Sequence, residues 1–168
     1  MLYFVKVTLL ILIFVFQQGE GYSEEAEEVS VNLAVDFELQ DLSGKTHNLS
    51  GYFKEGTVVV WFTNFCGGCQ KALPELREVF FEKAVNLLII SLLGDDVETP
   101  QDMVKQYQLP FSVLLDTDGK VCRQYSGNYI PDTCPLNNLY IINTAGKIVE
   151  RTHYPGLDKS ELMELLEK

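Results

Sequence analysis

The chain has 168 residues, 46% of them hydrophobic, and its formal net charge is −11. A chain of this length can build one domain around one core after the loss of a leader. Its basic residues are scattered through an acidic sequence, so a role in binding nucleic acid has no electrostatic support.

The N-terminus has the pattern of an export signal. Lys6 precedes an apolar run over residues 7–16, which is too short for a membrane span of about 20 residues but suits a secretory signal. Gly19 and Gly21 form a small-x-small pattern, which favours cleavage after Gly21. We therefore predict a signal peptide over residues 1–21, with an uncleaved membrane anchor as the alternative.

Either outcome exports the rest of the chain to a periplasmic, extracytoplasmic or secreted location, where disulfides form and persist. Residues 22–30 are acidic and poor in apolar side chains, and we predict a disordered linker there. The folded domain is then expected over residues 31–168.

The domain opens with the pattern of a β-hairpin. Apolar and polar residues alternate over residues 35–39, which indicates a half-buried strand. Turn-forming residues follow at 41–45, and residues 46–49 can return as the second arm. His47 lies on this arm, and we expect its side chain on the solvent face.

A buried strand then leads into a helix through a Cys-x-x-Cys motif. Residues 58–62 are all β-branched or aromatic, as in a strand buried on both faces of a parallel sheet. After Cys66 and Cys69, apolar residues recur at helical spacing, at Leu73 and Leu76.

This placement suits disulfide exchange. A helix start presents free N–H groups and the positive end of a dipole, and both favour a thiolate over a thiol. We therefore expect a lowered pKa for Cys66 at the helix start and a covered, less reactive Cys69 one turn inside. One attacking and one resolving sulfur is the arrangement that thiol–disulfide exchange needs.

A Cys-x-x-Cys motif can also supply half of a zinc site, which then needs two further ligands. Cys122 and Cys134 are twelve residues apart, and His47 and His153 are isolated in the sequence. We therefore predict no metal site and no cofactor beyond a redox-active disulfide.

The rest of the sequence continues to alternate strand and helix signals, which indicates an α/β domain. The elements that we predict are a buried strand over 85–93, a helix with Thr99 as N-cap and Pro100 in its first turn, a strand over 111–115, a turn over 116–119, a short helix over 121–125, a hairpin of strands 139–142 and 148–151, and a last helix with a capping box of Asp158 and Glu161.

With the motif placed after a buried strand in this order, the chain resembles thioredoxin-fold proteins of the redoxin group, and more closely the exported TlpA/ResA-type thiol-disulfide oxidoreductases. The matching segments are residues 35–45, 58–76, 111–116 and 139–146. The resemblance implies a thioredoxin-like α/β fold, with a central mixed β-sheet flanked by helices and an extra N-terminal β-hairpin. It also implies a monomer that exchanges disulfides with exported protein thiols and is served by an upstream redox partner.

The active-site segment departs from the family pattern at four positions. Phe65 replaces the usual Trp before the first cysteine, and Gly67 and Gly68 bring no proline or charge between the cysteines. Ala72 stands where many relatives carry a Glu that handles protons near the second cysteine, so that task falls to water or to another residue here.

The family also has a cis-proline loop packed against the dithiol. Counting back from Asn143 places this loop at Asn137, and the nearest proline is Pro135. We favour Pro135 as the cis residue of a longer loop; the alternative is that the feature is absent.

Cys122 and Cys134 form an even pair in an exported protein, which favours a structural disulfide. Two alternatives remain. In one, Cys122 is a buried core residue and Cys134 a free thiol. In the other, Cys134 exchanges directly with Cys66.

Two other functions compete with disulfide exchange at Cys66 and Cys69. Thr63 precedes Cys66 by three residues, as in the Thr-x-x-Cys motif of peroxiredoxins, so a thiol peroxidase that uses Cys66 is one alternative. The other is a non-enzymatic metal carrier or interaction module of the same fold, although the copper carriers use a Cys-x-x-x-Cys spacing that is one residue longer.

Overall fold

The computed structural model describes residues 32–83, 85–125, 134 and 136–167. Its strands are β1 (Glu38–Asp41), β2 (Thr46–Asn48), β3 (Val58–Thr63), β4 (Asn86–Ser91), β5 (Ser112–Leu115), β6 (Asn138–Ile142) and β7 (Ile148–His153). Its helices are α1 (Leu49–Tyr52), α2 (Gly67–Lys83), α3 (Glu98–Tyr107), α4 (Lys120–Gln124) and α5 (Lys159–Leu165).

The strands form one mixed sheet in the order β2-β1-β5-β4-β3-β6-β7. The three central strands are parallel, with Trp61 of β3 opposite Ile89 of β4 and Ile90 of β4 opposite Leu114 of β5. The hairpin β1–β2 and the hairpin β6–β7 extend this centre on its two sides through antiparallel pairing. The predicted thioredoxin-like sheet with an added N-terminal hairpin is thus confirmed.

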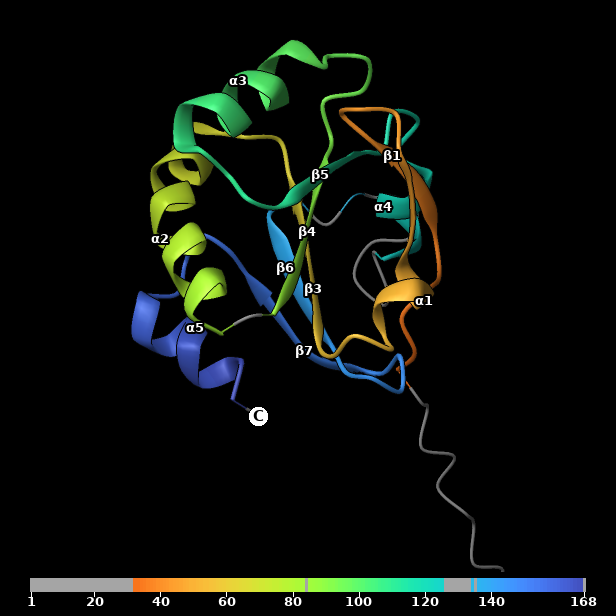
Figure 1. Ribbon diagram of the computed structural model, residues 1–168, viewed down its shortest axis with the longest axis vertical. Helices are drawn as coiled ribbons and strands as arrows, with labels where there is room; N and C mark the ends of the chain where they lie inside the picture. Colours follow the sequence, from red (N-terminus) through yellow and green to blue (C-terminus); the bar gives the residue numbers. More distant parts are fainter. Residues whose placement is uncertain (1–31, 84, 126–133, 135, 168) are drawn as a thin grey trace, which may run out of the picture. The chain divides into compact units, whose positions relative to one another are not determined.

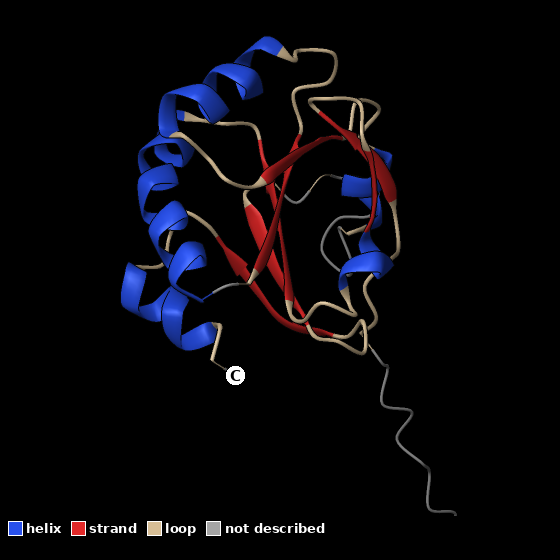
Figure 2. Ribbon diagram, in the orientation of Figure 1, coloured by secondary structure: helices blue, strands red, loops and turns tan. Residues whose placement is uncertain are grey.

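Helices cover both faces of the sheet. Figures 1 and 2 show α2, α3 and α5 on one face and α1 and α4 on the other. Because side chains alternate along a strand, β3 feeds both cores: Trp61 packs with α2 and α5, whereas Phe62 packs with α1 and α4. All six residues of β3 are buried, as the continuous apolar run predicted.

Several local predictions are confirmed. The hairpin of β6 and β7 closes through a turn in which the Gly146 N–H donates to the Asn143 carbonyl, at 2.9 Å. Helix α5 has the predicted capping box: the Asp158 side chain accepts from the Glu161 N–H, and the Glu161 side chain accepts from the Asp158 N–H.

The predicted N-cap of α3 is wrong. This helix begins at Glu98, after Val97, and Thr99 already lies inside its first turn. Asp96 instead accepts from the Thr99 N–H, at 3.0 Å, and from the Thr99 hydroxyl, at 2.7 Å. The Thr99 N–H, one of the free N–H groups at the start of α3, is therefore bonded by Asp96, which lies three residues before the predicted N-cap.

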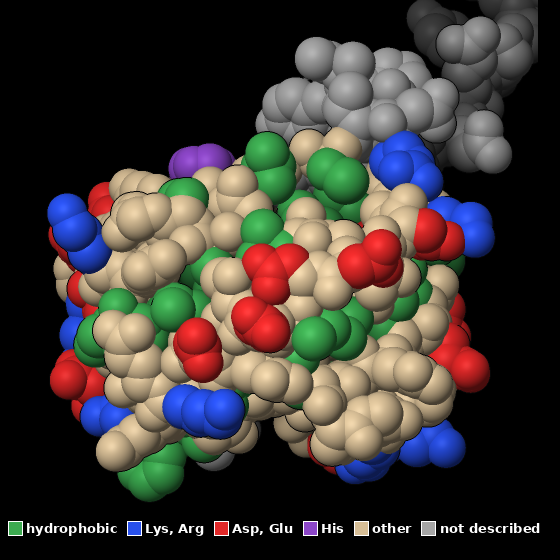
Figure 3. All heavy atoms as spheres, turned by 90° about the horizontal axis from the view of Figure 1, so that it is seen from above, with side chains coloured by type: hydrophobic (Ala, Val, Ile, Leu, Met, Phe, Trp, Pro, Cys, Tyr) green, Lys and Arg blue, Asp and Glu red, His purple; other side chains and the backbone are tan. Residues whose placement is uncertain are grey.

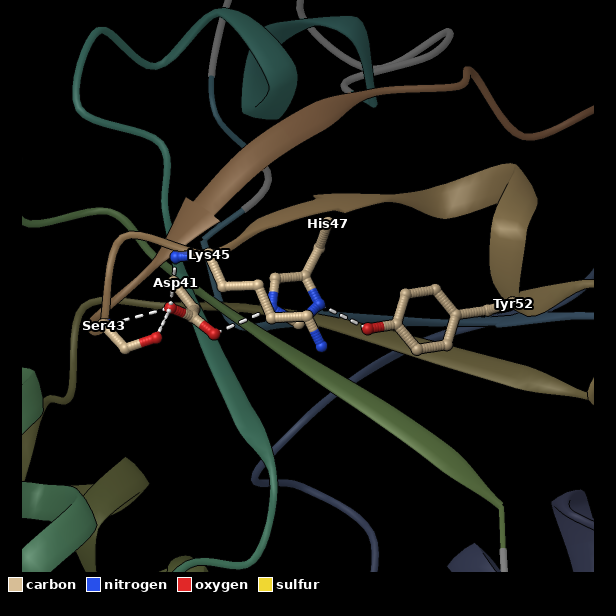
Figure 4. Close-up of polar contacts among 5 residues, drawn as sticks. All are labelled: Asp41, Ser43, Lys45, His47 and Tyr52. Carbon is tan, nitrogen blue, oxygen red and sulfur yellow. Dashed lines mark hydrogen bonds and ion pairs between the residues drawn. The ribbon is translucent and has the colours of Figure 1, made fainter.

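The predicted solvent-facing position of His47 is also wrong, since its side chain is only 5% exposed. Its Nε2 lies 2.8 Å from the Asp41 carboxylate, and its Nδ1 lies 2.5 Å from the Tyr52 hydroxyl, as Figure 4 shows. A carboxylate can only accept, so Nε2 carries the hydrogen of that bond, and Nδ1 pairs with the Tyr52 hydroxyl. Both ring nitrogens are thus paired, which permits burial.

Among the residues that the structure describes, none of the helices is long and apolar enough to cross a membrane.

Candidate active site

The Cys-x-x-Cys motif lies where β3 passes into α2. The strand ends at Thr63 and the helix begins at Gly67, so Cys66 stands immediately before the helix and Cys69 within its first turn. The two cysteines form a disulfide with a Cα–Cα separation of 5.0 Å. Cys69 is completely buried, whereas Cys66 is only partly buried. An incoming sulfur can therefore reach Cys66 more easily than Cys69.

A tight turn presents Cys66 at the helix start. Phe65 has a left-handed backbone, with φ of 52°, and its side chain is buried. Its N–H donates to the Thr63 hydroxyl oxygen at 3.0 Å, and the Cys66 N–H donates to the Asn64 side-chain oxygen at 3.2 Å. The Gln70 side chain donates to the Phe65 carbonyl at 2.8 Å. These bonds fix the approach of the chain to α2.

The helix start itself offers stabilisation for a thiolate. The Cys69 N–H points at Cys66 Sγ, at 3.3 Å. This N–H and the helix dipole favour negative charge on Cys66, and they require no charged neighbour. Gly67 and Gly68 are both exposed and leave the approach to Cys66 open.

Two segments far along the chain face the motif. Asn137, which precedes β6, places its side-chain oxygen 3.2 Å from Cys69 Sγ and its side-chain nitrogen 3.9 Å from Cys66 Sγ. Pro155, which follows β7, lies beside Gly68: its ring is 3.7 Å from where a Gly68 Cβ would stand. The Asn137 carbonyl accepts from the Tyr154 N–H at 2.7 Å, which ties these two segments together.

Pro135, the predicted cis residue, lies outside the described residues. The structure has a cis peptide bond at Tyr154–Pro155. The sequence count did lead to Asn137 as the loop position opposite the dithiol, but neither the contact of its side chain with both sulfurs nor the presence of Pro155 was predicted.

Tyr154 packs in the core next to the two cysteines. It is completely buried, its carbonyl accepts from the Trp61 indole at 3.0 Å, and its hydroxyl donates to Glu75 at 3.2 Å. Burial and the negative charge of Glu75 raise the pKa of Tyr154 far above its ordinary value, so this hydroxyl stays protonated. The hydroxyl is also 3.5 Å from the Ala72 carbonyl.

The other cysteine pair lies away from this site. Cys122 is in α4, and it forms a disulfide with Cys134 at a Cα–Cα separation of 5.0 Å. Both residues pack against the core under α1 and α4, whereas Cys66 and Cys69 pack against the core under α2. The structure therefore does not bring the two pairs into one site.

No group of three or more His, Cys, Asp or Glu side chains that could hold a metal ion occurs within the described part of the chain. Among the described residues, the site brings together two sulfurs, the start of a helix, a carboxamide and an apolar surround.

Known proteins resemble this chain in sequence and in fold. The model of the AhpC/TSA family matches residues 31–151. Thiol-disulfide oxidoreductase ResA of Bacillus cereus (strain ZK / E33L) is 30% identical over 139 residues, which cover 81% of this chain and 77% of that protein. The ResA of Bacillus thuringiensis subsp. konkukian is 28% identical over 174 residues, which cover 99% and 95%. A secreted Mycobacterium tuberculosis disulfide oxidoreductase has the same fold, with a TM-score of 0.63, 24% identity and coverage of 78% of this chain and 94% of that one.

Proposed function

Because the chain belongs to the AhpC/TSA family, and within it to the ResA-type thiol-disulfide oxidoreductases, we propose that Cys66 is the nucleophile and Cys69 the resolving cysteine of an enzyme that exchanges disulfides with other proteins. The observation that carries the assignment is the difference in access between a partly exposed Cys66 at the helix start and a completely buried Cys69.

In the reducing direction, the Cys66 thiolate attacks one sulfur of a substrate disulfide. That S–S bond breaks, the departing substrate sulfur takes up a proton, and a mixed disulfide forms at Cys66. Cys69 then loses its proton and attacks the Cys66 sulfur, which releases the second substrate sulfur as a thiolate and leaves the Cys66–Cys69 disulfide. An upstream protein dithiol restores the reduced form with two electrons, and the reverse sequence oxidises a substrate dithiol.

This assignment predicts which variant traps partners. Cys69→Ala removes the resolving sulfur, so mixed disulfides at Cys66 should accumulate, whereas Cys66→Ala should trap none. Non-reducing electrophoresis and mass spectrometry of each purified variant with a disulfide-bonded protein such as insulin would measure this. Equal trapping by both variants would show that the roles are assigned wrongly.

The peroxidase alternative can be tested on the same samples. The buried Thr63 hydroxyl already accepts the Phe65 N–H within the turn, which supports a structural task for this residue. We therefore expect slow peroxide consumption by the reduced protein compared with its reduction of insulin. Rapid peroxide consumption that depends on Cys66 alone would favour the peroxidase instead.

The partners that we propose are exported proteins that carry thiols or disulfides. Figure 3 shows one end of the molecule, on which acidic and hydrophobic side chains are interspersed at the centre and basic ones lie towards the rim. A face of this kind is better suited to a protein surface than to a polyanion.

The proposal also covers the rest of the chain: residues 1–21 act as a signal peptide, residues 22–30 as an acidic linker and residues 31–168 as the working domain, a monomer outside the cytoplasm. Mass spectrometry of the exported protein should find an N-terminus close to residue 22. An intact Met1 in the membrane fraction would instead identify the segment as an anchor.

A further inference from the structure

We propose that Asn137 is a positioning residue that selects one state of the reduced site, with Cys66 as the thiolate and Cys69 as the thiol. The inference rests on the proposed exchange at Cys66 and Cys69 and adds a residue to it. It starts from the side-chain carboxamide of Asn137, which reaches both sulfurs although Asn137 lies 68 residues after Cys69 and 71 residues after Cys66 in the sequence.

The two ends of the carboxamide face different sulfurs. The oxygen, which can only accept, lies 3.2 Å from Cys69 Sγ, and the nitrogen, which can only donate, lies 3.9 Å from Cys66 Sγ. In the disulfide neither sulfur carries a hydrogen, so the Asn137 oxygen has nothing to accept from Cys69.

Reduction changes this match. When the disulfide takes up two electrons from a partner dithiol and one proton, the site holds one thiol and one thiolate. A Cys69 thiol can donate to the Asn137 oxygen, and a Cys66 thiolate can accept from the Asn137 nitrogen as well as from the Cys69 N–H. The opposite assignment would place the Cys69 thiolate against the carboxamide oxygen, which repels it. Asn137 therefore stabilises the reduced form over the disulfide and directs the charge to Cys66.

The backbone explains why an asparagine can stand here. Asn137 has a left-handed φ of 58°, a conformation that asparagine adopts more readily than most residues, and its carbonyl is held by the Tyr154 N–H. Glycine tolerates the same backbone, so Asn137→Gly removes the carboxamide without adding strain. Asn137→Asp keeps the shape and replaces the donor by a negative charge.

The test combines these two variants with a matched control, Gln108→Gly. Gln108 is likewise left-handed, with φ of 51°, but it ends α3. The pH dependence of Cys66 alkylation, followed peptide by peptide with mass spectrometry, gives the pKa of Cys66. Equilibration with glutathione gives the reduction equilibrium constant of the Cys66–Cys69 pair.

We expect Asn137→Gly to raise the pKa of Cys66 and to make the pair about tenfold harder to reduce, which corresponds to about 30 mV. Asn137→Asp should change both quantities further in the same direction, because a carboxylate repels the thiolate. Gln108→Gly should match the wild type.

A purely structural role predicts another result: Asn137→Gly would then keep the wild-type pKa of Cys66 and the wild-type equilibrium constant. That result would overturn the inference. Both measurements are made on the protein alone, so they stand apart from the trapping of partners by Cys69→Ala. Normal trapping by Cys69→Ala, together with a wild-type pKa and equilibrium constant for Asn137→Gly, would refute this inference only. Absent trapping would refute the proposed function.

Discussion

At the scale of single residues, the cluster of Asp41, His47 and Tyr52 shows how hydrogen bonds to both ring nitrogens permit the burial of a histidine. The Asp41 carboxylate also accepts from the Ser43 hydroxyl, at 2.6 Å, and from the Lys45 N–H, at 3.0 Å. Burial acts to raise the pKa of Asp41, but the hydrogen bonds from Ser43, His47 and Lys45 outweigh it and hold this pKa far below its ordinary range. The carboxylate thus closes the β1–β2 turn and holds His47 against Tyr52 of α1.

This cluster predicts a dependence of stability on pH. Because the folded-state pKa of Asp41 lies below the unfolded value of about 3.9, its contribution is fully present above that pH and is lost as the pH falls towards the folded-state pKa. Asp41→Asn should therefore lower the free energy of unfolding by about 1.5–3 kcal/mol at pH 7, the range for hydrogen bonds to charged groups.

The difference between Asp41→Asn and the wild type should shrink as the pH falls below about 4. Urea unfolding across pH 2–7 measures it, and Asp95→Asn, at an exposed position, serves as the control. A difference that is independent of pH would mean that the ionised carboxylate contributes nothing.

At the scale of elements, the predictions succeeded where the pattern lies in consecutive residues. They failed where a hydrogen-bond partner outside the pattern sets the start of a helix or the burial of a side chain. The apolar run of β3 and the capping box of α5 are both written in consecutive residues, and both were predicted. The start of α3 was misplaced because Asp96, rather than Thr99, satisfies the helix start. His47 was misplaced because nothing in the three polar residues of β2 indicates burial.

The same distinction holds for the site. The access difference between Cys66 and Cys69 follows from their order relative to a helix start, so the motif sufficed to predict it. The contacts of Asn137 and Pro155 with the motif depend on how the hairpin β6–β7 pairs with β3, since both residues adjoin that hairpin. A single sequence gives no register for that pairing, and the polar character of Asn137 suggests a surface loop as readily as an active-site contact.

At the scale of the whole molecule, the sheet separates two hydrophobic cores, and each contains one pair of cysteines. The core under α2, α3 and α5 supports the redox site, and the core under α1 and α4 holds the pair Cys122–Cys134. The buried Asp116 carboxylate accepts from the Cys122 N–H at 2.7 Å and from the Val121 N–H at 3.3 Å, which fixes the start of α4. We propose that the Cys122–Cys134 disulfide is structural and ties Cys134 to α4 in the core opposite the dithiol.

The proposed role predicts a loss of stability without a loss of chemistry. The double variant Cys122→Ala/Cys134→Ala leaves no unpaired thiol and places a small apolar residue at the buried position of Cys122. Loss of this disulfide, whose cysteines are twelve residues apart, should lower the free energy of unfolding by about 2–3 kcal/mol according to the chain-entropy account. Chemical denaturation of the oxidised proteins measures this loss.

Insulin reduction by the double variant should remain close to that of the wild type at a temperature where both are folded, because Cys66 and Cys69 pack against the opposite core. The single variants are unsuitable for this comparison, since each leaves a thiol that can exchange with Cys66. An unchanged free energy of unfolding combined with a large loss of insulin reduction would assign Cys122 and Cys134 to the exchange reaction, and the structural role would then be wrong.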